Sequence, residues 1–251
     1  MIQIDGLFIH TVQREDFLVR CSVLHGDRRT VIWDTLTRPQ DMAPVLRACS
    51  SQAPLVVYSH ADWDHVGGTA VFAPDTLVMA HRSCLARFQD DVPQTLRALR
   101  TNEPGLWDDV RLIEPNVLFD TRLDLDLGGV TLELHHLPGH TADAIVGFVP
   151  QWGLLLAGDA VELPCPCVPH EPDLVSWISG LTQWLHHPGL RRVLPSHGPS
   201  GGSEVVAQTI AYLQGLLHGR PVPMPADLPT FYSQTHLDNM QACGLKIVCS
   251  A

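Results

Sequence analysis

The stretch "SHADWDHVGG", Ser59–Gly68, gathers metal-capable side chains directly after "PLVVY", a short apolar run that predicts a buried strand. Alternate residues of an extended chain project to the same side, so His60, Asp62 and Asp64 are expected to point together. His65 departs in another direction as the backbone turns through the two glycines that follow, because glycine permits a tight turn. This one segment therefore offers ligands for two metal ions a few ångströms apart.

Three later segments have a similar form, in which an apolar run leads to a candidate ligand beside a glycine. They are "LELHHLPGHT", which contains His140, "LLLAGD", which ends at Asp159, and "RRVLPSH", which ends at His197. A single histidine after a strand is more often an ordinary loop residue. Combined with the first segment, these residues indicate a metal site where several strand ends meet at one edge of a sheet.

The remaining pattern mixes helices and strands in two successive β-rich halves. The alternating segment "LDLDLGGVTLELHHL" predicts a hairpin around Gly128 and Gly129, and "SEVVAQTIAYLQGLLHG" predicts a helix. The segment from about Val92 to Asp120 is less regular, and "KIVCS" near the end predicts a last short strand. This pattern favours two sheets packed face to face between layers of helices.

Composition limits the classes of function. The chain has 251 residues, 45% hydrophobic and 17% charged, so we expect a single domain over residues 1–251 with a short C-terminal extension from about 220–251. A net charge of -11 without a basic stripe argues against nucleic acid, and no stretch approaches the ~20 apolar residues of a membrane span. No secretion signal is readable and no CxxC pair occurs, so we expect a cytoplasmic protein that acts on a small molecule. The sequence does not decide the oligomeric state, and a homodimer is one alternative.

The order of "HADWDHVGG", "GHT", "GD" and a strand-terminal "SHG" resembles the metallo-β-lactamase-fold hydrolases from roughly Asp34 to Gly198. The resemblance implies an α+β fold, a four-layer αββα sandwich of two mixed β-sheets flanked by helices, with a dinuclear metal site at one edge. It also implies seven metal ligands, namely His60, Asp62 and His140 for the first ion, Asp64, His65 and His197 for the second, and Asp159 as a bridge between them. Asp34, in "WDT", matches an early structural aspartate of the family that supports the metal loop without ligating.

Two positions depart from the family pattern. The glycine usually found after "DT" is Leu36 here, and the usual His-x-His-x-Asp-His has become His-x-Asp-x-Asp-His, with Asp62 at the second ligand position. A carboxylate there adds a negative charge and a harder oxygen donor to the first site. One interpretation keeps two divalent ions, both zinc, because aspartate is an ordinary zinc ligand. The other places iron or manganese at the site containing Asp62, as in the related flavodiiron proteins, which carry a glutamate at this position.

The resemblance implies a hydrolase that uses a metal-bridging hydroxide on a small ester, lactone, thioester or phosphoester. Asp64 is expected to be a catalytic residue that both ligates and orients the nucleophile, and His236 in the tail is a candidate to act on substrate or leaving group. The roles of Tyr232 and of the loop with Cys165, Cys167 and His170 stay open at this point. The alternatives are an iron oxidoreductase resembling the sulfur dioxygenases, with one or two ions, and a non-catalytic metal-binding module.

Overall fold

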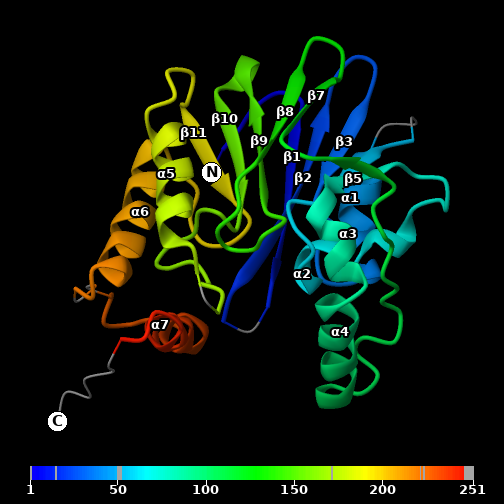
Figure 1. Cartoon of the computed structure of the whole chain (residues 1–251). Coiled ribbons are helices and arrows are strands. Elements are labelled where there is room, and N and C mark those ends of the chain that lie inside the picture. Colours follow the sequence, from blue (N-terminus) through cyan, green and yellow to red (C-terminus); the bar gives the residue numbers. More distant parts are fainter. Residues whose placement is uncertain are drawn as a thin grey trace.

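The structure is a computed structural model that describes residues 2–14, 16–49, 53–170, 172–220, 222 and 224–245. Its strands form two sheets that face each other across the middle of the molecule (Figure 1). The first sheet has the order β1 (Leu7–Gln13), β2 (Leu18–His25), β3 (Thr30–Trp33), β4 (Leu55–Val57), β5 (Val78–His81) and β6 (Val117–Phe119). The second has the order β11 (Arg192–Pro195), β10 (Leu154–Gly158), β9 (Ile145–Val149), β8 (Thr131–His136) and β7 (Arg122–Asp126).

Both sheets are mixed, as the resemblance implied. In the first, β1, β2 and β3 pair antiparallel and the strands from β3 to β6 pair parallel. In the second, β10 and β11 pair parallel and the other neighbours pair antiparallel. The predicted hairpin joins β7 to β8, and its turn uses Gly128 and Gly129 at φ values of 86° and 72°. Such angles favour glycine, which explains why the two glycines stand there.

Alternate side chains of the strands separate the hydrophobic interior into layers. In β3, Val31 and Trp33 belong to the core between the two sheets, whereas Ile32 belongs to the core on the outer face of the first sheet. In β9, Ile145 points between the sheets and Val146 points to the helices on the second sheet. This period of two is the expected consequence of a sheet that is buried on both faces. The four-layer αββα sandwich is therefore confirmed.

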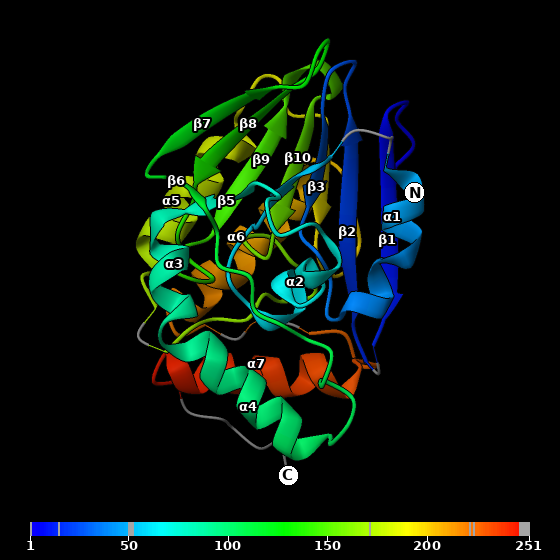
Figure 2. The same ribbon diagram turned by 90° about the vertical axis from the view of Figure 1, so that its right-hand side faces the viewer.

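Helices cover the outer face of each sheet. On the first sheet lie α1 (Ala43–Ala48) and α3 (Arg82–Phe88), and on the second lie α5 (Leu174–Leu185) and α6 (Ser203–Leu217) (Figure 1). Three helices lie toward one end of the sandwich, namely α2 (Trp63–Val66), α4 (Asp91–Asn102) and α7 (Thr230–Ala242) (Figure 2). Short 3-10 turns complete the described elements at η1 (Pro39–Met42), η2 (Thr69–Val71) and η3 (Pro150–Trp152).

The structure adds regularity where the sequence shows little. The segment predicted to be irregular contains α4, whose only proline, Pro93, occupies the first turn, where a missing N–H costs no helical hydrogen bond. From the predicted extension, α7 packs on the core of the second sheet through buried Tyr232. The strand predicted at residues 246–250 lies outside the described residues. Among the described helices, none combines the length and apolar character needed to cross a bilayer.

Candidate metal centre

The candidate ligands of the first cluster follow β4 at the edge of the first sheet. The chain stays extended only as far as Asp62, which caps the N-terminus of α2. Asp64 and His65 lie inside that single helical turn, so the extended arrangement predicted for Asp64 is wrong. The ligands from the second sheet come from loops after β8, β10 and β11 and reach the same edge.

The carboxylate of Asp159 lies at the centre of the four histidines. Its Oδ2 atom is 3.2 Å from Nε2 of His197, 3.4 Å from Nε2 of His65, 3.7 Å from Nε2 of His140 and 3.8 Å from Nε2 of His60. One oxygen atom thus faces both halves of the cluster. This is the position that a ligand bridging two ions must occupy.

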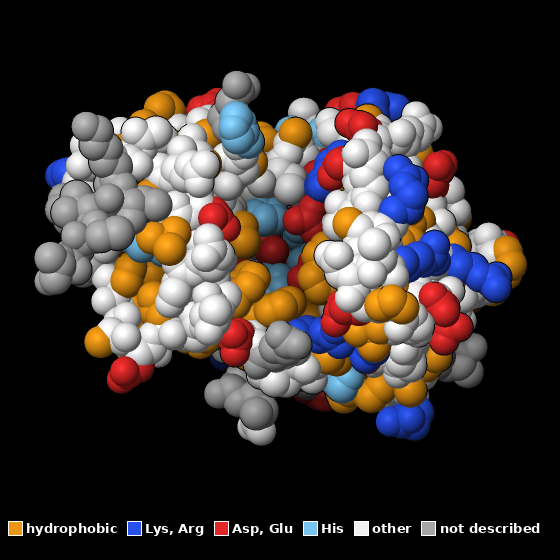
Figure 3. Space-filling view, turned by 90° about the horizontal axis from the view of Figure 1, so that it is seen from below, with side chains coloured by type: hydrophobic (Ala, Val, Ile, Leu, Met, Phe, Trp, Pro, Cys, Tyr) orange, Lys and Arg blue, Asp and Glu red, His pale blue; other side chains and the backbone are white. Residues whose placement is uncertain are grey.

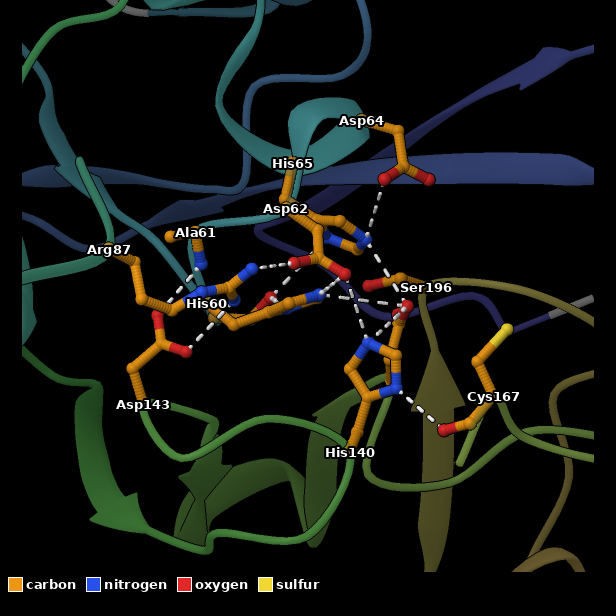
Figure 4. A network of polar contacts seen from close by, with 12 residues as sticks. His60, Ala61, Asp62, Asp64, His65, Arg87, His140, Asp143, Cys167 and Ser196 are labelled. Atoms are coloured by element: carbon orange, nitrogen blue, oxygen red, sulfur yellow. Dashed lines mark hydrogen bonds and ion pairs between the residues drawn. The ribbon is translucent and has the colours of Figure 1, made fainter. Parts of the chain in front are cut away.

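The first group of ligand atoms consists of His60, His140 and Asp159, which offer atoms within 4.8 Å of one another. Asp62 joins them, because its Oδ2 atom lies 3.2 Å from Nε2 of His140 and 3.4 Å from Nε2 of His60 (Figure 4). Two imidazole nitrogens and carboxylate oxygens suit zinc, iron or manganese.

The second group consists of Asp64, His65 and His197, whose ligand atoms also lie within 4.8 Å of one another. Nε2 of His197 is 3.3 Å from Asp64 Oδ2, and Nε2 of His65 is 3.7 Å from Asp64 Oδ1. Both histidines are buried, so this group is as sheltered from water as the first. The structure therefore brings together all seven candidate ligands that the resemblance implied.

Each of the four histidines turns Nε2 inward and holds Nδ1 against a fixed partner. The Nδ1 partners are Ser59 Oγ for His60 (3.0 Å), Asp34 Oδ2 for His65 (3.0 Å), the Cys167 carbonyl for His140 (2.9 Å) and the Leu18 carbonyl for His197 (2.6 Å). Metal-ligating histidines show this arrangement, because the outer hydrogen bond fixes the tautomer and the ring orientation. Two buried atoms of the cluster, His60 Nε2 and Asp159 Oδ1, have no hydrogen-bond partner among the described residues. Bound cations would satisfy both, so the residues fit a metal centre.

The charges of the cluster are strongly coupled. Burial alone would lower the pKa of His65 and His197, but the surrounding carboxylates, Asp159 foremost, raise both well above the usual range. Against the same effect of burial, Asp62 and Asp159 raise the pKa of His140 to about 9. Without a metal the site therefore holds imidazolium–carboxylate pairs, and metal binding must displace these protons.

The sequence comparison decides the family. The sequence model of the metallo-beta-lactamase superfamily matches residues 14–179 of this chain. The chain belongs to the metallo-β-lactamase superfamily. No curated protein matches the sequence.

Several solved structures share the fold of this chain. A metallo-β-lactamase from Pontibacter korlensis has a TM-score of 0.65 and 22% identity, covering 85% of this chain and 97% of that one. An archaeal superfamily protein from Sulfolobus tokodaii has a TM-score of 0.68 and 15% identity, covering 94% and 98%. A stereoselective inverting sec-alkylsulfatase from Pseudomonas sp. has a TM-score of 0.69 and 18% identity, covering 95% of this chain but only 49% of the sulfatase. At these identities the similarity establishes the fold.

Asp34 supports the metal loop of this superfamily member without facing the ions. Its buried carboxylate accepts hydrogen bonds from Ser59, His65 and Ser196. The backbone pays for this position with strain, because Asp34 and Leu36 both have φ values of 60°. The glycine that the family usually has at position 36 adopts this φ angle without strain. Leu36 adopts the same angle here, and its side chain is fully buried.

Sequence reasoning missed Glu162, a buried carboxylate close to the cluster. Glu162 accepts a 2.8 Å hydrogen bond from the hydroxyl of Tyr232 on α7, and burial raises its pKa to about 7. His236 instead pairs with Tyr212 of α6 at 2.9 Å, so the structure brings Tyr232 rather than His236 to this carboxylate. The catalytic role of His236 stays a prediction.

The loop after Asp159 contributes backbone to the site. Cys167 supplies the carbonyl for His140, and the side chain of Asn239 on α7 holds this loop on both sides of it. Asn239 donates to the Pro166 carbonyl at 2.7 Å and accepts from the Val168 N–H at 2.8 Å. Cys165 is buried and burial raises the pKa of its thiol to about 12, whereas His170 is exposed.

The molecule is hollowed over the metal cluster. Figure 3 shows histidine and acidic side chains at the bottom of this hollow and hydrophobic side chains around it. Three half-buried aromatic residues from different segments, Phe17, Trp63 and Phe231, meet nearby. The centre of the Phe17 ring lies 4.7 Å from that of Phe231, 6.4 Å from that of Trp63 and 5.5 Å from that of His197. A cavity of about 920 Å³ beside α6 has none of the candidate ligands among its lining residues.

Proposed function

We propose that this superfamily member is a hydrolase that depends on two divalent metal ions and cleaves a small ester, lactone, thioester or phosphoester. The observation that carries the proposal is the position of Asp159, whose Oδ2 atom lies 3.2–3.8 Å from Nε2 of all four buried histidines. A carboxylate in that position would be able to hold two ions at once. A structural role alone would not leave His60 Nε2 and Asp159 Oδ1 buried without partners.

When bound, two divalent ions supply a water of lowered pKa and polarise the oxygen that gathers negative charge during hydrolysis. The residues of the chain provide the frame for this chemistry. His60, His140 and Asp62 would hold one ion, and Asp64, His65 and His197 the other. Asp64 directs one oxygen toward each of its two histidines, so either oxygen is able to ligate while the other orients the attacking water.

The completeness of the second group favours a hydrolase over a mononuclear iron oxidoreductase. An enzyme with a single ion has no need for a buried second set of ligands. Here Asp64, His65 and His197 are all present, buried and mutually oriented. The full set of candidate ligands also argues against a non-catalytic metal-binding module.

Zinc is the proposed metal, with iron or manganese as the alternative at the site that contains Asp62. Nitrogen from histidine and oxygen from aspartate suit all three metals. The substrate is proposed to be a small molecule, because the net charge of -11 disfavours nucleic acid and aromatic side chains stand beside the cluster.

Metal content and turnover test this function together. Protein purified without added metal should contain two metal ions per chain by elemental analysis. It should turn over at least one member of a panel made of p-nitrophenyl esters, bis-p-nitrophenyl phosphate, a homoserine lactone and a chromogenic β-lactam. Two ions without turnover on any substrate would count against the hydrolase. One iron per chain with oxygen consumption would favour the oxidoreductase.

A further inference from the structure

Arg87 on α3 binds three carboxylates at the edge of the metal cluster. Its guanidinium lies 2.6 Å from Asp62 Oδ1 and 3.1 Å from Asp143 Oδ1 (Figure 4). It also lies 2.6 Å from Asp91 Oδ2. Asp91 is the first residue of α4. Asp62 comes from the segment between β4 and α2, and Asp143 from the loop after β8 that also carries His140. A planar guanidinium is suited to such a junction, because its donors point in fixed and different directions.

The two oxygens of Asp62 therefore have separate roles. Oδ1 accepts from Arg87, and Oδ2 faces Nε2 of His60 and Nε2 of His140 at 3.4 and 3.2 Å. With one oxygen held by Arg87, Asp62 is left with a single oxygen for a metal ion. A histidine at this position would offer a single donor atom as well.

The charges of Asp62 and Arg87 also suit this arrangement. Aspartate at position 62 adds one negative charge compared with the neutral histidine of the usual family pattern. Arg87 supplies one positive charge in direct contact, and only 20% of its side chain and 27% of that of Asp62 are exposed. At this degree of burial the pair is weakly screened by solvent, so Arg87, which Asp62 shares with Asp91 and Asp143, offsets part of the extra charge.

We propose that Asp62 and Arg87 act together as one ligand of the first metal site, with Arg87 as a positioning residue that orients Asp62 Oδ2 and offsets part of its charge. This inference rests on the proposed dinuclear centre. It explains why an unusual carboxylate is accommodated at this position, because the pair presents one oriented donor whose charge is partly offset by the guanidinium. Asp143 extends the support, since its other oxygen accepts from the N–H of Ala61, the neighbour of Asp62.

The proposal predicts that the family's usual ligand is not tolerated here alone. Asp62→His supplies an imidazole but leaves Arg87 with only Asp91 and Asp143 as partners, so a positive charge stays beside the first group without the carboxylate that faced it there. Its dissociation constant for first-site Zn²⁺, measured by competition with a chromophoric chelator, should rise at least about tenfold. Adding Arg87→Gln to Asp62→His removes that charge and should return the constant to within about threefold of wild type.

A neighbouring arginine provides the matched control. Arg82 lies on the same helix, is exposed and pairs with Asp120, away from the cluster. Asp62→His with Arg82→Gln should bind Zn²⁺ as weakly as Asp62→His alone. Wild-type affinity in Asp62→His, or no recovery on adding Arg87→Gln in a folded protein, would overturn the proposal.

Folding is followed separately from first-site binding. Cooperative melting and retention of one Zn²⁺ in the second group identify folded variants. If the double variant does not fold, Asp62→Glu decides, because it keeps the carboxylate for Arg87 and should lose less first-site affinity than Asp62→His; the reverse order contradicts the pair. Wild-type stoichiometry tests the proposed dinuclear centre, and the ratio between variants tests the pair, so the two failures are distinct.

Discussion

The carboxylate of Asp34 accepts two hydrogen bonds from Ser59, one from its backbone N–H at 2.7 Å and one from its hydroxyl at 2.8 Å. Ser59 is the residue before His60, and its hydroxyl oxygen is also the Nδ1 partner of His60. Asp34 follows β3 and Ser59 follows β4, so this contact joins the ends of two parallel strands at the base of the metal loop. The orientation of His60 is therefore set by a residue that touches no metal.

Replacing Asp34 should damage both the fold and the metal site. Asp34→Ala leaves the Ser59 N–H and the Nδ1 of His65 without their buried acceptor, so the free energy of unfolding should fall by about 2–5 kcal/mol. Zn²⁺ affinity should fall about 10–100-fold, as for other residues that orient ligands. Urea unfolding and chelator competition measure the two effects. Asp126→Asn, at an exposed ion pair with Arg28, should change unfolding by less than about 0.5 kcal/mol.

Removing one histidine from each ligand group should separate the two ions. His140→Ala removes a donor of the first group and His197→Ala a donor of the second. Each variant should bind one Zn²⁺ tightly and the other at least about tenfold more weakly, as resolved in a two-site titration. Unchanged occupancy in both variants contradicts the ligand assignment. His186→Ala, at the exposed end of α5, should bind both ions like wild type.

Stability of the metal-free protein should fall as the pH rises above 6.5. The pKa of His140 is about 9 in the folded protein, above its ordinary value of 6.5, so its stabilising charge is fully present below pH 6.5 and lost through pH 9. The loss from this group is at most about 3 kcal/mol. Zn²⁺ affinity should rise over the same interval, because fewer protons compete.

Urea unfolding of chelator-treated protein at pH 6.5, 8 and 9 tests this dependence, with His140→Ala as the control that should show a shallower change. A metal-free protein that becomes more stable across this interval would contradict the assigned imidazolium pairs.

Loss of the contact between α7 and the loop at Cys167 should weaken metal binding. Asn239→Leu preserves size but leaves the Val168 N–H and the Pro166 carbonyl without their buried partner, which should cost about 2–4 kcal/mol of unfolding free energy. Because the carbonyl between them accepts from His140, first-site Zn²⁺ affinity should fall more than second-site affinity. Gln241→Ala, exposed on the same helix, should leave both constants unchanged. Equal losses at the two sites would indicate a general effect of unfolding.

The ligands were predictable because each follows a strand and the order of motifs is specific. His60 and Asp159 directly extend apolar runs, so the sequence places them at a sheet edge. The residues around the candidate ligands, such as Arg87 and Glu162, were not predictable in the same way. Arg87 lies in an ordinary amphipathic helix, and nothing in its neighbourhood indicates that it meets Asp62, because that contact depends on how α3 packs on the first sheet. Glu162 is similar, since its partner Tyr232 is 70 residues away.

The candidate ligands are divided between the two sheets, and this division determines when during synthesis and folding each metal site is complete. His60, Asp62, Asp64 and His65 follow β4 of the first sheet, whereas His140, Asp159 and His197 follow strands of the second. During synthesis the first group of candidate ligands is complete only after Asp159 has emerged, and the second only after His197 has emerged, and both need the two sheets to dock. Metal binding would therefore come late in assembly, and ions held by ligands from both sheets would stabilise the docked sheets against separating.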